Sequence, residues 1–239
     1  MTPPAYLESF RIMVDELLAH PLVEVTHLSP IPRFSKTGKR AWTEHRNKMA
    51  RSLRGYTSDR ALVDLITALH AVKIRWNLHD HPLTKKHPPK QFLHEVVEQP
   101  ATACIALPYL GEFQHRPHEN FVYFDFETDD DTVTIGNQTY PRGTFKRSIR
   151  LFDVFDNYYD VAYVTPPGGP DGLILGRSAH ADYSSRIIDV DTYVRLLLAT
   201  RGSIELRVAF FDGNYELPDQ PPSLDTLLET LRERAAVAA

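Results

Sequence analysis

The chain of 239 residues contains a single cysteine, Cys104, which lies in an apolar run. One thiol excludes an internal disulfide, and we expect Cys104 to be a small buried residue and not a nucleophile. The sequence has no run of about 18 apolar residues, and its first residues lack a basic segment followed by an apolar one. These absences argue against a membrane span and a secretion signal. We therefore expect a protein of the cytoplasm, where thiols stay reduced.

Complete motifs for metal, phosphate or acyl-transfer chemistry are also missing. The eleven histidines include three among prolines and two spaced by three residues, without the supporting carboxylates or cysteines of a zinc site. They are His79, His81 and His87, and His115 and His118. The residues His180, Asp182, Ser184 and Ser185 supply the types of a hydrolase triad, but residues so close in sequence rarely converge, and no GxSxG elbow is present. We expect no catalytic residues, no cofactor and no metal site.

Charge is distributed unevenly along the chain. The formal net charge is −4, but residues 1–90 have a balance of +7 and residues 91–239 a balance of −11. The segment 33–54 has eight basic residues, opposed only by Glu44. They are Arg33, Lys36, Lys39, Arg40, Arg46, Lys48, Arg51 and Arg54. The segment suits a solvated face, a protein-binding surface or a phosphate-binding surface, and nucleic acid is the weakest of the three because no known nucleic-acid-binding signature accompanies it.

An acidic group stands before a predicted hairpin in the second half of the chain. It consists of Glu127, Asp129, Asp130 and Asp131. The glycine and terminal glutamate of a calcium loop are missing, so we do not expect a calcium site. The group is either a solvated approach to the hairpin or an acidic surface for a basic partner. We retain it as the candidate partner-binding surface.

Hydrophobic periodicity predicts an α+β protein. Apolar spacing predicts helices over 3–19, from about Trp42 in the basic segment, over 59–70 with Thr57 or Ser58 as cap, and from Ser223 onward. Alternation or short apolar runs predict strands at 23–25, 72–76, 103–109, 121–126, 150–155 and 158–164, with a hairpin around Gly136-Asn137. The segment 204–211 is ambiguous, because its β-branched and aromatic residues favour a strand while the nearby helix permits a second helix.

The best-defined stretch is 172–202, which predicts a strand, a loop and an amphipathic helix. Leu173, Ile174 and Leu175 have the pattern of a buried strand, and Asp189 and Asp191 can accept hydrogen bonds at a helix start. Gly202 can take the left-handed conformation that ends a helix. We expect Asp182, Ser184 and Ser185 to cap turns before that helix.

Four blocks in order resemble the SUKH superfamily of fungal cell-wall-synthesis regulators and bacterial immunity proteins. They are HAVKIRW (70–76), CIALPYLGEF (104–113), IRLFDVFDNYYDVAYV (149–164) and LILGRSAHADYSSRIIDVDTYVRLLLATRG (173–202). The last block is the most specific, with a His-x-Asp-Tyr element at His180–Tyr183 and a terminal Thr-Arg-Gly. The resemblance covers about residues 57–211.

This resemblance implies a central antiparallel sheet of about five to six strands backed by helices, without enzymatic activity or cofactor. The division it implies is an N-terminal helical, basic extension over 1–56, a SUKH-like domain over 57–211, and a linker with a C-terminal helix over 212–239. The implied function is an intracellular immunity protein that binds and neutralises a cognate toxin, with a nuclease as one possibility. A regulatory or scaffolding domain is the alternative within the superfamily.

Overall fold

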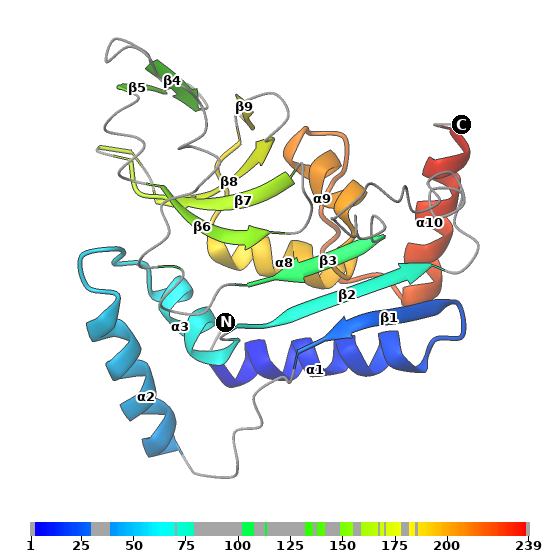
Figure 1. The fold of residues 1–239 in the computed structure, drawn as a ribbon, viewed down its shortest axis with the longest axis horizontal. Coiled ribbons are helices and arrows are strands. Elements are labelled where there is room, and N and C mark those ends of the chain that lie inside the picture. The colour runs from blue at the N-terminus through cyan, green and yellow to red at the C-terminus, as the bar shows by residue number, and fades with distance from the viewer. Residues whose placement is uncertain are drawn as a thin grey trace, which may run out of the picture.

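The structure is a computed structural model of an α+β protein (Figure 1). It describes residues 3–29, 39–69, 71–78, 102–107, 113, 132–135, 138–141, 149–154, 159–166, 168–169, 171–177, 182–184 and 186–237. The helices are α1 (Pro3–Ala19), α2 (Lys39–Ser52), α3 (Arg60–Ala68), α8 (Val190–Thr200), α9 (Ile204–Phe211) and α10 (Leu224–Val237). The strands are β1 (Val23–Leu28), β2 (Lys73–Leu78), β3 (Ala103–Ala106), β4 (Thr132–Ile135), β5 (Gln138–Pro141), β6 (Ile149–Val154), β7 (Tyr159–Val164), β8 (Gly172–Arg177) and β9 (Asp182–Tyr183). None of the described helices is long and apolar enough to cross a membrane.

The described strands form three antiparallel sheets, and the single central sheet of about five to six strands that the resemblance implies is not confirmed. Their orders are β1-β2-β3, β4-β5 and β6-β7-β8-β9. Strands β3 and β6 lie side by side between the first and third sheets, but they do not form a backbone ladder (Figure 1). The reason is local: the Ala106 N–H of β3 donates to the Asp153 carboxylate of β6 at 2.7 Å. A side chain therefore occupies the place of a backbone acceptor where the two sheets meet.

The N-terminal segment is built into the main core. The predicted apolar stripe of α1 is buried at Leu7, Phe10, Met13, Val14 and Leu17, but its last predicted member, Leu18, is 57% exposed. Strand β1 pairs with β2, placing Val25 opposite Trp76, so the segment 1–56 supplies an edge strand as well as helices. The division into 1–56, 57–211 and 212–239 stays a prediction, although one hydrophobic cluster contains residues from all three.

Helix α3 begins one residue later than predicted and has a different cap. The side chain of Asp59 is the N-cap and accepts hydrogen bonds from the Ala61 and Leu62 N–H groups. Thr57, one of the two predicted caps, instead accepts from the Asp59 N–H at 2.9 Å. The carboxylate of Asp59 reaches the first-turn donors and satisfies the groups that a cap must pair.

Strands β7 and β8 are buried on both faces, which confirms the buried strand predicted at 173–175. Val161 and Tyr163 of β7 and Leu173 and Leu175 of β8 face the main core. Residues between them, including Ala162 and Ile174, join a smaller cluster. Its members are Tyr140, Ile149, Ala162, Val164 and Ile174. Tyr140 comes from the β4–β5 hairpin, whose predicted two-residue connection is confirmed by the pairing of Ile135 with Gln138.

The ambiguous segment 204–211 is a helix, so the strand that its composition favoured is wrong. The Ser203 side chain caps α9 by accepting from the Leu206 N–H at 3.4 Å. Five of the eight residues of α9 are buried, among them Leu206, Phe210 and Phe211. A helix covered on most sides needs apolar residues at nearly every position, and this removes the helical periodicity that identifies an amphipathic helix.

The other two C-terminal helices agree with the sequence. Asp189 caps α8, with its side chain accepting from the Thr192 N–H at 2.7 Å, and Ser223 does the same for the Thr226 N–H of α10 at 3.2 Å. The predicted strand at 121–126 lies outside the described residues.

Candidate functional site

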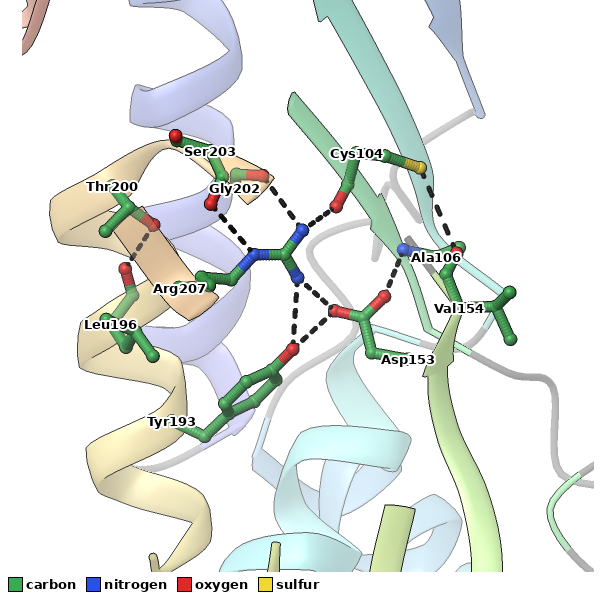
Figure 2. A network of polar contacts seen from close by, with 10 residues as sticks. All are labelled: Cys104, Ala106, Asp153, Val154, Tyr193, Leu196, Thr200, Gly202, Ser203 and Arg207. Atoms are coloured by element: carbon green, nitrogen blue, oxygen red, sulfur yellow. Dashed lines mark hydrogen bonds and ion pairs between the residues drawn. The ribbon is translucent and has the colours of Figure 1, made fainter. Parts of the chain in front are cut away.

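The most organised polar cluster is a closed network around Arg207 of α9 (Figure 2). Its Nη1 donates to Asp153 Oδ2 at 2.9 Å and to the Tyr193 hydroxyl at 3.1 Å. Its Nε and Nη2 donate to three backbone carbonyls. These are Ser203 at 3.3 Å, Gly202 at 2.9 Å, and Cys104. A guanidinium has five N–H donors, and here five acceptors surround it.

The Asp153 carboxylate is satisfied in the same way. Oδ1 accepts from the Ala106 N–H, and Oδ2 accepts from Arg207 and from the Tyr193 hydroxyl at 2.7 Å. The side chains of Arg207 and Asp153 are both 0% exposed. Complete pairing is what makes the burial of two opposite charges tolerable, because each unpaired charge would cost several kcal/mol.

A bulge in β6 positions the carboxylate. The register of β6 against β7 shifts between Leu151 and Asp153, which makes Phe152 an extra residue. Consecutive side chains of a regular strand point to opposite faces, but a bulge can direct both toward one neighbour. Here the Phe152 ring meets the Tyr193 ring edge-on, with centroids 5.8 Å apart, while Asp153 accepts from the hydroxyl of the same Tyr193.

Burial shifts the ionisation of the groups in this network. It raises the pKa of the Asp153 carboxyl above its usual range, while Arg207 and the Tyr193 hydroxyl act in the opposite direction. It also raises the pKa of the Tyr193 hydroxyl, as does the neighbouring charge of Asp153. The thiol of Cys104 is buried and its pKa rises to about 11, first through burial and then through Asp153. These shifts favour neutral forms for the hydroxyl and the thiol.

The network is a structural connection and not a reaction centre. Each donor of Arg207 and each oxygen of Asp153 already has a protein partner, and both side chains are closed to solvent. A ligand would have to break these bonds to enter. The network joins β3 of the first sheet, β6 of the third sheet, α8 and the α8–α9 junction. It therefore holds these two sheets against helices α8 and α9.

Sequence reasoning missed this network, although one pattern indicates it. Arg207 stands in the apolar run IELRVAFF and Asp153 in LFDVF. A charged residue within an otherwise buried run is rarely tolerated without a partner of opposite sign. The two residues were therefore candidates for a buried pair.

The predicted hydrolase-type residues are only partly described. Ser184 is buried, and its hydroxyl accepts from the Leu175 N–H at 3.3 Å and donates to the Arg186 carbonyl at 3.1 Å. It therefore fixes the chain between β8 and α8, as the capping interpretation predicts. His180 and Ser185 lie outside the described residues, as does the side chain of Asp182.

The predicted partner-binding residues Glu127, Asp129, Asp130 and Asp131 also lie outside the described residues. So do the histidines at 79, 81, 87, 115 and 118. Within the described part of the chain, no group of three or more His, Cys, Asp or Glu residues could hold a metal ion. The acidic partner-binding surface therefore stays a prediction.

A second charged feature is the basic surface formed by α2 and the start of α3. Arg46 of α2 makes a two-point contact with the Asp64 carboxylate of α3, with Nη2 3.2 Å from Oδ2 and Nε bonded to Oδ1. Arg60 Nε lies 4.0 Å from the same carboxylate. Beyond Arg46, Lys48, Arg51 and Arg54 are exposed. The predicted helix in the basic segment is confirmed and begins at Lys39.

Comparisons of the chain with models of protein families, with curated proteins and with solved structures found no match.

Proposed function

We propose that this chain is a non-enzymatic binding protein of the SUKH type, acting as an immunity protein that neutralises a cognate protein toxin. The observation that supports this proposal is the convergence of three of the four SUKH-like blocks on the Arg207 network. Cys104 belongs to the block 104–113, Asp153 to 149–164, and Tyr193 and Gly202 to 173–202, and all four contact Arg207. Three of the four blocks that suggest the family therefore meet at one buried side chain, Arg207.

The arrangement favours a binding role, because the polar residues of the SUKH-like region contact one another inside the protein and stabilise the fold. Arg207, Asp153 and Tyr193 direct their polar groups at one another inside the protein. In a protein of this kind, the surface that recognises a partner can vary while the internal network holds the scaffold. Binding then depends on exposed side chains of suitable charge and shape.

The acidic group Glu127, Asp129, Asp130 and Asp131 is the proposed toxin-binding surface. A nuclease holds phosphates with basic side chains, and an acidic surface complements such a site and accelerates association. The balance of −11 over residues 91–239 strengthens the field in which these four carboxylates act.

The test is co-expression in bacteria with the protein encoded next to this chain. We expect the neighbour to arrest growth alone and this chain to restore it, and we expect purified proteins to form a complex. Replacing all four acidic residues by lysine is expected to abolish rescue and to slow association most strongly at low salt.

A matched variant controls for the change of net charge. Glu216, Asp219, Glu229 and Glu233 are exposed acidic residues of the C-terminal segment. Their replacement by lysine changes the net charge equally and should leave rescue intact. A harmless neighbour would contradict the immunity role and favour the regulatory alternative. Rescue and complex formation that the first variant leaves unchanged would contradict this surface only.

A further inference from the structure

Four exposed cations lie along the C-terminal end of α2, the turn that follows it and the start of α3. We call Lys48, Arg51, Arg54 and Arg60 the cationic face. All four are exposed, and the side chain of Arg60 is 81% exposed. Arg60 lies 4.0 Å from the Asp64 carboxylate, and Arg51 Nε donates to the Asn47 carbonyl at 3.2 Å. No carboxylate in the described chain neutralises Lys48, Arg51 or Arg54.

Buried side chains and an ion pair hold the backbone that carries the cationic face. Met49 and Leu53 are buried beneath it, and Arg46 is paired with the nearly buried Asp64 of α3. Asp64 also attracts Arg60, so one carboxylate faces two guanidinium groups and the local charge stays positive. Figure 1 shows α2 at one side of the molecule, with its C-terminal end leading into α3.

The spacing of these cations suits a linear array of negative charges. Lys48, Arg51 and Arg54 follow one another at intervals of three residues, and the Arg54 N–H bonds to the Arg51 carbonyl at 3.3 Å where the helix ends. Lys48 and Arg51 are separated by about 4.5 Å of helix axis, and Arg54 follows in the turn after Ser52, where α2 ends. Duplex DNA carries one negative charge for about every 1.7 Å of axis, so three such cations can each meet a phosphate of the backbone.

The composition of this surface favours a nucleic acid over a protein. Protein interfaces have an apolar centre and few charged residues there, whereas nucleic-acid interfaces are polar and strongly positive. Among the described residues, the exposed large hydrophobic side chains are Ile12, Leu18, Leu22, Leu28 and Val154. None of these belongs to α2 or α3, so the cationic face offers charge without an apolar anchor.

We propose that the cationic face binds the phosphate backbone of a nucleic acid without reading its sequence. This inference concerns a different surface from the proposed toxin-binding residues and does not depend on them. Guanidinium groups pair with phosphate oxygens through two parallel hydrogen bonds, and the three arginines of the face can each do so.

The experiment measures fluorescence anisotropy of a short labelled DNA duplex titrated with the full chain. We expect binding at about 50 mM salt that weakens steeply toward about 200 mM, with roughly 0.9 unit of logarithmic slope for each phosphate contacted. The double variant Arg51→Glu and Arg54→Glu should reduce the slope by about two units and the affinity by at least about tenfold.

The matched control is Arg195→Glu with Arg232→Glu, on exposed positions of α8 and α10. It makes the same change in net charge and should leave DNA binding nearly unchanged. Thermal melting by circular dichroism verifies that both variants are folded, and Arg51→Gln with Arg54→Gln replaces the first variant if it is not. Absence of binding at low salt, or an equal loss in both variants, overturns the proposal. Displacement of DNA by polyglutamate at lower charge concentration than by unlabelled DNA also overturns it, in favour of an acidic polypeptide.

Discussion

At the scale of residues, one buried pair of opposite charges connects the sheets and helices of this fold. Arg207 and Asp153 are closed to solvent, yet each polar atom of the pair has a partner. Sequence reasoning placed Cys104 correctly as a buried residue, but it assigned no role to Arg207, whose run 204–211 it left open between strand and helix. Two of the five partners of Arg207, Asp153 and Cys104, are 54 and 103 residues away in sequence, and such distances leave no local pattern.

We expect Arg207→Met to reduce the free energy of unfolding by about 3 to 5 kcal/mol. Methionine fills similar volume, but the buried Asp153 carboxylate would lose its opposite charge, and the carbonyls of Ser203, Gly202 and Cys104 would each lose one donor. Urea unfolding measures the change. Labelling of the single cysteine offers a second measurement, because the Cys104 thiol is buried and its pKa of about 11 keeps it protonated near neutral pH.

In the native protein the thiol should react slowly, and Arg207→Met should accelerate labelling in proportion to the lost stability. Arg195→Met, at an exposed position of α8, should change stability by less than about 0.5 kcal/mol. A loss below about 1 kcal/mol in Arg207→Met would mean that the network contributes little to stability.

At the scale of elements, the sequence predicted best where periodicity or capping acts locally. Helices α1, α3, α8 and α10 and the β4–β5 hairpin depend on neighbouring residues, and they occur where the sequence predicted them. The predicted cap of α3 was wrong, because Asp59 takes that role. The sequence left α9 open between a strand and a helix, because composition does not display the cap that Ser203 provides. The break between β3 and β6 was also not predictable, because it depends on the Asp153 side chain.

Gly202 at the α8–α9 junction provides a prediction at this scale. Its φ is +77°, and a Cβ there would lie 2.5 Å from Cγ1 of Ile105 in β3. We expect Gly202→Ala to destabilise the protein through both left-handed strain and overlap. Gly213 has a φ of +78°, but a Cβ at that position would meet no atom within 4 Å.

Gly213→Ala should therefore cost only the left-handed strain, about 1 to 2 kcal/mol. Gly202→Ala should cost roughly 1 to 3 kcal/mol more, since packing at β3 must shift. Thermal denaturation of the two variants measures the difference. Equal destabilisation would show that Ile105 moves aside freely.

At the scale of the molecule, segments from both ends of the chain belong to one core. Tyr6 of α1 donates to Asp191 of α8 at 2.6 Å, and Arg201 contacts Glu16 of α1 at 2.8 Å and the Pro222 carbonyl at 3.0 Å. The apolar side chains of α10 join the same hydrophobic cluster as Trp76 of β2. The unity of this core was not predictable from a sequence in which 1–56 and 212–239 look like separate extensions.

We expect Leu228→Ala in α10 to lower the stability of the β1-β2-β3 sheet by about 2 to 5 kcal/mol, because Leu228 is buried in the same hydrophobic cluster as Trp76 of β2. Fluorescence during urea unfolding measures it, since Trp76 is buried in β2 and donates to the Arg201 carbonyl at 2.8 Å. Leu18→Ala, at a position 57% exposed, should have little effect. An unchanged fluorescence midpoint in Leu228→Ala would mean that α10 unfolds independently.

The interruption between β3 and β6 has a consequence for the order of folding. Pairings within β6, β7 and β8 join strands that are close in sequence, so their loops close at low entropic cost. The Asp153 and Arg207 contacts that connect the sheets span far longer loops, and we expect them to form after the rate-limiting step. Disruption of the network should therefore accelerate unfolding and leave the refolding rate nearly unchanged, which makes this junction a determinant of kinetic lifetime.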